Sequence, residues 1–181
     1  MSNVSTQLVE IYTLLSRSAL NKEYYGVRLH RVQKLNDILE IAIAVGTTGS
    51  GISALTLWKI DPWGPLVWGT LTVVSAALAV VKPIIQLNKR IERLTRLYLG
   101  HTDNYSNLLV LVSRIKRLGT LTPEISSLFE TAEAKFQELA KDDDPRPDMM
   151  LLNRCEEVIR KRHPAQLAWY PDSETGAVGS V

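Results

Sequence analysis

Two uncharged stretches dominate this sequence, Ile41–Trp58 and Pro62–Val81, and only Lys59-Ile60-Asp61 separates them. A helix needs roughly 20 mostly apolar residues to cross the ~30 Å hydrocarbon core of a membrane, and each stretch is close to that length. Two helices joined by so short a link must fold back on each other. The sequence therefore predicts a two-span transmembrane hairpin. The alternative is a buried helical hairpin of a soluble protein, because Gly46–Gly51 makes the first stretch only weakly apolar.

Basic residues flank both stretches, whereas the link between them carries one Lys and one Asp. They are Lys22, Arg28, Arg31 and Lys34 before the first stretch, and Lys82, Lys89, Arg90, Arg93 and Arg96 after the second. An excess of Lys and Arg marks the cytoplasmic side, and Trp favours the membrane interface. Trp58, Trp63 and Trp68 lie around the turn. The sequence thus predicts a multi-pass membrane protein with both termini in the cytoplasm.

The rest of the chain has helical periodicity, so we expect an all-α membrane protein with long cytoplasmic helices, assembled as a symmetric oligomer. No cleaved signal peptide is expected, since no basic segment followed by an apolar run opens the chain. We expect an N-terminal cytoplasmic helix, the transmembrane hairpin, a long heptad helix, a C-terminal helical subdomain and a flexible tail. Their ranges are 1–36, 37–82, 83–119, 120–163 and 164–181.

A heptad pattern follows the second stretch. Its positions are Ile84, Leu87, Ile91, Leu94, Tyr98, His101, Tyr105, Leu108, Val112 and Ile115. Such spacing predicts a long helix whose apolar seam lies within one chain or along an oligomer axis. Gly119 is expected to end this helix. Thr122 and Pro123 are expected to begin the next helix, and Asp148 to cap the last one.

Small residues recur every four positions in the first stretch, at Ala42, Gly46, Ser50 and Ala54, and Thr47 and Ser53 add hydroxyl groups. In lipid, small residues allow helices to pack closely. Hydroxyl groups also line water-filled pores. The stripe therefore indicates helix packing in an oligomer or a pore lining, and chance composition is the third interpretation.

Two basic clusters occur near helix ends. They are Arg114, Lys116 and Arg117, and Arg160, Lys161 and Arg162. Cations at a helix C-terminus are favourable without any ligand. The functional interpretation is a site for phosphates, which Arg binds well, and hence for a nucleotide or a single-stranded oligonucleotide.

No pattern typical of a catalytic centre or a metal site is present, so we expect neither enzyme activity, nor a cofactor, nor a bound metal. The single cysteine, Cys155, is expected to be a core residue. His101 lies in the heptad pattern, and we expect its role to be structural.

The layout resembles the SLATT group of bacterial two-span effectors over roughly residues 10–118. The resemblance rests on three features: Tyr24-Tyr25-Gly-Val-Arg28-Leu-His30-Arg31, the hairpin with its tryptophan-bearing turn, and the long helix that starts Gln86-Leu-Asn-Lys-Arg90. It implies a defence effector that damages the inner membrane and is controlled by a nucleotide. It also implies a co-encoded nucleotidyltransferase as a partner.

Together these features predict a pore-forming effector of anti-phage defence. The chain would assemble with copies of itself in the lipid bilayer, and a nucleotide second messenger or single-stranded oligonucleotide on the basic clusters would gate it. Two alternatives stay open: a structural membrane anchor for a partner protein, and a holin-like pore former.

Overall fold

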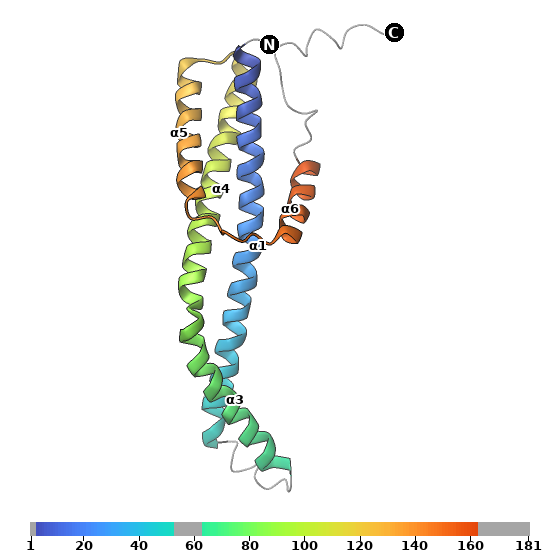
Figure 1. Cartoon of the computed structure of the whole chain (residues 1–181), viewed down its shortest axis with the longest axis vertical. Coiled ribbons are helices and arrows are strands. Elements are labelled where there is room, and N and C mark those ends of the chain that lie inside the picture. Colours follow the sequence, from blue (N-terminus) through green and yellow to red (C-terminus); the bar gives the residue numbers. More distant parts are fainter. Residues whose placement is uncertain (1–2, 53–62, 163–181) are drawn as a thin grey trace, which may run out of the picture. The chain divides into compact units, whose positions relative to one another are not determined.

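The computed structural model describes residues 3–52 and 63–162, and these residues form helices and no strand (Figure 1). Helix α1 is Asn3–Ile52, α3 is Trp63–Ile85, α4 is Leu87–Leu118, α5 is Pro123–Ala140 and α6 is Met149–Arg162. The all-α class expected from the sequence is therefore confirmed for the described residues. The expected segment boundaries at positions 36 and 82 fall inside α1 and α3.

The chain divides into two compact units. Unit 1 combines Met1–Val27 with Thr95–Val181, and unit 2 is Arg28–Leu94. Both α1 and α4 contribute to each unit, so each unit brings together segments that are far apart in the sequence.

The core of unit 1 lies between the first part of α1, the second part of α4, and α5, which Figure 1 shows side by side. Its members are Leu8, Ile11, Leu14, Leu15, Leu108, Leu111, Val112, Ile115, Ile125, Phe129 and Ala132. The heptad positions Leu108, Val112 and Ile115 are thus buried within one chain. At these three positions the apolar seam therefore lies within one chain and not along an oligomer axis.

Local sequence signals set the helix ends in unit 1 as expected. Gly119 follows α4 with φ = 64°, a left-handed conformation that glycine adopts without steric cost. Thr122 caps α5, since its side-chain oxygen accepts a 3.3 Å hydrogen bond from the Ile125 amide, and Pro123 is the first helical residue. Asp148 caps α6 by accepting a 3.1 Å hydrogen bond from the Leu151 amide.

Unit 2 contains the end of α1, all of α3 and the start of α4. Lys82 and Glu40 form a 2.8 Å ion pair between α3 and α1, and the Ser75 hydroxyl donates a 3.4 Å hydrogen bond to the Ala42 carbonyl. Gln86, with φ = 51°, separates α3 from α4. A left-handed residue that is not glycine is uncommon, so Gln86 marks a local break between two helices rather than one continuous rod.

The expected transmembrane hairpin and the inner-membrane location are wrong for the described residues, where no helix is both long enough and apolar enough to span a membrane. In α1, only the five apolar residues Ile41–Val45 separate Glu40 from a stretch rich in glycine, serine and threonine. In α3, Gly69, Thr70 and Ser75 interrupt the apolar side chains, and Lys82 lies in the last turn. The expected link at Lys59–Asp61 lies outside the described residues.

Candidate functional site

The first basic cluster lies in the last turns of α4. Arg114 forms a 3.2 Å ion pair with Glu124, at the start of α5. Lys116 and Arg117 are exposed. The position of these cations at the C-terminus of α4 gives a favourable interaction with the helix dipole. Their exposure also suits a surface that binds anions.

The second basic cluster forms the last turn of α6. Lys161 makes a 2.7 Å ion pair with Glu157, and this hydrogen bond and charge lower the pKa of the Glu157 carboxyl. Arg162 lies 3.5 Å from Glu23 of α1, and Arg160 is exposed. Ion pairs of this exposed kind contribute little to stability.

The two basic clusters lie beside different parts of α1. Arg162 of the second cluster contacts Glu23 of α1. Arg114 of the first cluster contacts Glu124. Ser126, two residues after Glu124, accepts a hydrogen bond from Gln7 of α1. Positions 7 and 23 are roughly 24 Å apart along a helix axis. A single mononucleotide therefore does not bridge both clusters of one chain.

Only one member of the small-residue stripe has a described environment. Ala42 is partly buried and its carbonyl accepts the hydrogen bond from Ser75. Gly46, Thr47 and Ser50 lie in α1, but their side-chain surroundings are not described, and Ser53 and Ala54 lie outside the described residues.

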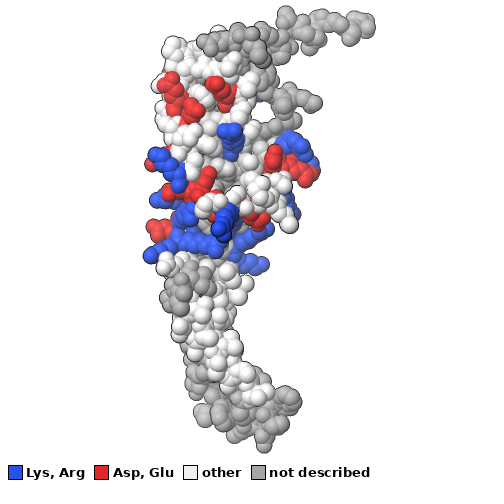
Figure 2. All heavy atoms as spheres, in the orientation of Figure 1, with Lys and Arg blue, Asp and Glu red and all other residues white. Residues whose placement is uncertain are grey.

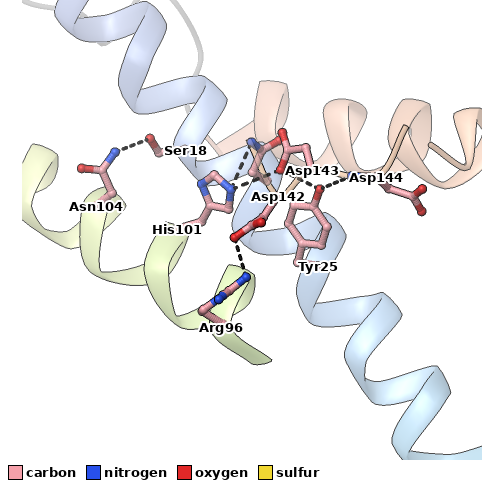
Figure 3. Close-up of polar contacts among 9 residues, drawn as sticks. Ser18, Tyr25, Arg96, His101, Asn104, Asp142, Asp143 and Asp144 are labelled. Atoms are coloured by element: carbon pink, nitrogen blue, oxygen red, sulfur yellow. Dashed lines mark hydrogen bonds and ion pairs between the residues drawn. The ribbon is translucent and has the colours of Figure 1, made fainter. Parts of the chain in front are cut away.

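A polar cluster that the sequence did not reveal lies where α1, α4 and the α5–α6 loop meet (Figure 3). The Tyr25 hydroxyl donates a 2.8 Å hydrogen bond to Oδ1 of Asp143 and accepts one of 3.4 Å from the Asp144 amide. Nε2 of His101 lies 3.9 Å from the same Asp143 oxygen, and its ring stacks on that of Tyr25 with centroids 5.7 Å apart. Both rings are buried.

The surroundings of Tyr25 favour its neutral form. Burial is the largest cause, and the hydrogen bond to Asp143 and the charge of that carboxylate add to it, so the pKa of the Tyr25 hydroxyl rises well above its usual range. A protonated tyrosine keeps its role as a donor to Asp143. The contact is therefore a hydrogen bond from a neutral hydroxyl group to the Asp143 carboxylate.

Two further contacts hold the same loop. The Tyr24 hydroxyl accepts a 3.0 Å hydrogen bond from the Asp148 amide, and Arg96 forms an ion pair with Asp142. The rings of Tyr24 and Tyr25 pack edge to face, with centroids 5.1 Å apart. The loop between α5 and α6 is thus bound to α1 by two adjacent tyrosines and to α4 by one arginine.

A layer of buried polar side chains continues from the cluster along α4. Nδ2 of Asn104 donates a 3.3 Å hydrogen bond to the Ser18 hydroxyl, and Asn21 lies 3.4 Å from His101 Nε2. Ser18, His101 and Asn104 have no exposed surface. Among the described residues, His101 Nδ1 and Asn104 Oδ1 are buried atoms without a hydrogen-bond partner. Polar groups buried in this way favour one alignment of the two helices, because any shift leaves more of them unpaired.

The polar cluster is suited to a structural role, in which it holds the α5–α6 loop against α1 and α4. His101 is fully buried, so a substrate has no access to its ring. Within the parts of the chain that the structure describes, no group of three His, Cys, Asp or Glu side chains is placed to hold a metal ion. The cluster can hold or release the α5–α6 loop, which is a conformational role.

The sequence placed Lys141–Pro147 within the expected C-terminal helical subdomain, 120–163, and indicated no role for it. The available signal was the run Asp142-Asp143-Asp144, which places carboxylates where a basic or hydroxyl partner is needed. The partners, Tyr25 and Arg96, are distant in sequence, and nothing in the local pattern points to them.

No family model, no curated protein and no solved structure matches this chain. The resemblance to the SLATT group therefore stays a prediction from sequence layout.

Proposed function

We propose that the chain is a non-enzymatic assembly module, in which copies of the chain associate through α3 of unit 2. The observation that carries this proposal is the exposure of the uncharged part of α3. Between Trp63 and Val81 the sequence has no charged residue. Nevertheless Val73 is 69% exposed, Val80 64% and Leu66 60%.

The exposed surface of α3 extends around most of the helix. Its described exposed positions are Leu66, Gly69, Thr70, Val73, Val74, Ala76, Ala77, Ala79, Val80 and Val81. Among the side chains of α3 that the structure describes, only that of Ser75 is buried. At 3.6 residues per turn these positions cover an arc of roughly 220°. An apolar surface of this kind marks an interaction site.

A second copy of the chain is the occupant that fits this surface best. The surface is apolar and uncharged, so it is complementary to itself. Figure 2 shows Lys and Arg side chains over the first turns of α4, followed by a face of α3 without charged side chains. Because the exposed arc is wider than half of the helix circumference, contact with one neighbouring copy leaves part of this apolar surface exposed to solvent. A closed ring, in which each copy contacts two neighbours, covers more of it.

The ligand part of the proposal is a nucleotide or single-stranded oligonucleotide bound by the basic clusters. Three of their members pair with carboxylates, of which those of Glu124 and Glu157 are exposed and that of Glu23 is partly buried. Exposed pairs are weak, whereas Arg binds phosphate with two parallel hydrogen bonds, so a phosphate can displace these partners. In an assembly of several copies, each cluster is repeated and favours a polyanion.

Pore formation, membrane anchoring and the lipid bilayer as a partner depended on the transmembrane hairpin, and they are not part of this proposal. A role in anti-phage defence and a co-encoded nucleotidyltransferase follow from the SLATT resemblance alone and remain predictions.

The mass of the purified protein in solution, measured by light scattering after size exclusion, tests the assembly. The wild type is expected to be an oligomer, and Val73→Glu and Val80→Glu are expected to lower its mass, since each places a charge in the interface. Val110→Glu is the matched control, because Val110 is 56% exposed on α4 of unit 1. A monomeric wild type, or equal masses for all variants, contradicts the proposal.

Fluorescence anisotropy with short single-stranded DNA and with cyclic nucleotides tests the ligand. Arg117→Glu and Arg160→Glu are expected to weaken binding. Arg146→Glu, in the α5–α6 loop, is the control. Binding to the DNA is also expected to fall with salt on a log–log scale. Equal affinity in wild type and charge-reversed variants excludes these clusters as the site.

A further inference from the structure

We propose that the segment 141–162, which we call the arm, is a detachable element that opens as a unit while the α1–α4–α5 core stays folded, and that Tyr24 and Tyr25 hold it closed. The arm comprises the α5–α6 loop and α6. This device is independent of assembly through α3.

The buried side chains of the arm lie outside the main core. Those of α6 are Leu151, Cys155 and Ile159, and none of them belongs to the core cluster of unit 1. The buried side chains of α5, which are Ile125, Phe129 and Ala132, are all members of that cluster. Elements with few buried apolar side chains open at a lower free energy than the core of the same protein.

The arm cannot keep its structure once it leaves α1. A helix of 14 residues is marginal in water on its own. The loop from Lys141 to Asp148 contains no regular element. Docking and folding of α6 are therefore coupled, and opening exposes the inner face of α6 to solvent.

The hydrogen bonds that hold the arm come from two adjacent tyrosines of α1. Two ion pairs, Arg96 with Asp142 and Glu23 with Arg162, add to them. Tyr25 binds the side chain of Asp143 and the amide of Asp144, and Tyr24 binds the amide of Asp148. Asp148 is also the N-cap of α6, so this contact reaches the first turn of the helix. Removal of either hydroxyl is expected to favour the open arm with little effect on the core.

The chain contains its own reporter of opening. Cys155 is the only cysteine, and it is buried on the inner face of α6. A thiol reagent reaches it only when the arm opens or the whole protein unfolds. The labelling rate therefore measures the sum of the two processes.

The experiment measures the labelling rate of Cys155 by an excess of a maleimide reagent, in the full chain under native conditions. Tyr24→Phe removes one hydrogen bond and is expected to raise the rate about 5- to 10-fold. Tyr25→Phe removes two hydrogen bonds and is expected to raise the rate by at least as much. Tyr105→Phe is the control, since Tyr105 packs against the main core and lies under Lys22. It is expected to leave the rate within about 2-fold.

Hydrogen exchange separates arm opening from global unfolding in the same samples. The amides of 149–162 are expected to exchange much faster than those of 108–115, and the tyrosine variants to accelerate only the former. If 149–162 and 108–115 exchange with the same protection, the arm opens only by global unfolding and the proposal is wrong. Unchanged Cys155 labelling in both tyrosine variants also overturns it.

Discussion

The hydroxyl of Tyr25 donates a 2.8 Å hydrogen bond to Oδ1 of Asp143, which lies 118 residues further along the chain. This bond connects the first helix to the loop after the fourth described helix. It forms beside the fully buried ring of His101, whose Nε2 lies 3.9 Å from the same oxygen (Figure 3). The contact therefore couples the position of the arm to the polar layer between α1 and α4.

Alkaline pH is expected to destabilise the protein through Tyr25. Its pKa is raised in the folded state by burial and by Asp143, whereas in the unfolded chain it is about 10. The folded state thus holds this proton more tightly, and stability is fully present below about pH 10 and is lost as the pH rises above it. Urea unfolding between pH 8 and 11 measures the effect, with Tyr25→Phe as the reference. Identical pH profiles for the two proteins contradict the assignment.

The buried pair Ser18 and Asn104 is expected to show strong coupling. Ser18→Ala leaves the buried Asn104 amide without its 3.3 Å hydrogen bond and is expected to cost about 1–3 kcal/mol. Replacing both residues, as Ser18→Ala with Asn104→Leu, is expected to recover most of this loss, since it also removes the unpaired Asn104 Oδ1. A double-mutant cycle in urea measures the coupling. Additive losses from the two substitutions rule it out.

The helix ends and the inner seam followed from the sequence because they depend on local chemistry. Thr122 caps α5, and Gly119 takes the left-handed conformation after α4, as those residue types predict. Leu108 and Ile115 are buried because heptad spacing places them on one face of α4. These features need only the residues within a few turns.

The polar cluster could not be predicted, because its members come from three distant segments. Tyr25, His101 and Asp143 meet only once α1 and α4 are aligned. The membrane interpretation was based on two uncharged stretches, their basic flanks and the tryptophans between them. These are signals of composition and length, and among the described residues no helix is both long enough and apolar enough to span a membrane.

Two neighbouring leucines of α4 are expected to differ sharply. Leu108 is fully buried in the core of unit 1, whereas Leu109 is 36% exposed. Leu108→Ala is expected to cost about 2–5 kcal/mol, through lost burial and the cavity left behind. Leu109→Ala is expected to cost less than about 1 kcal/mol. Chemical denaturation of both variants measures the difference, and similar losses argue against the described packing of α4.

Gly100 and Leu139 are expected to be coupled through a close approach of α4 and α5. A Cβ atom at position 100 lies only 2.5 Å from Cδ2 of Leu139, so Gly100→Ala forces that side chain to move. In the wild-type background this crowding opposes the gain in helix propensity, which is about 1 kcal/mol for Gly to Ala. In a Leu139→Ala background the crowding is removed, and Gly100→Ala is expected to stabilise the protein by about that amount. Thermal unfolding of the four proteins measures the coupling. An equal effect of Gly100→Ala in both backgrounds means that α5 does not approach α4 at this position.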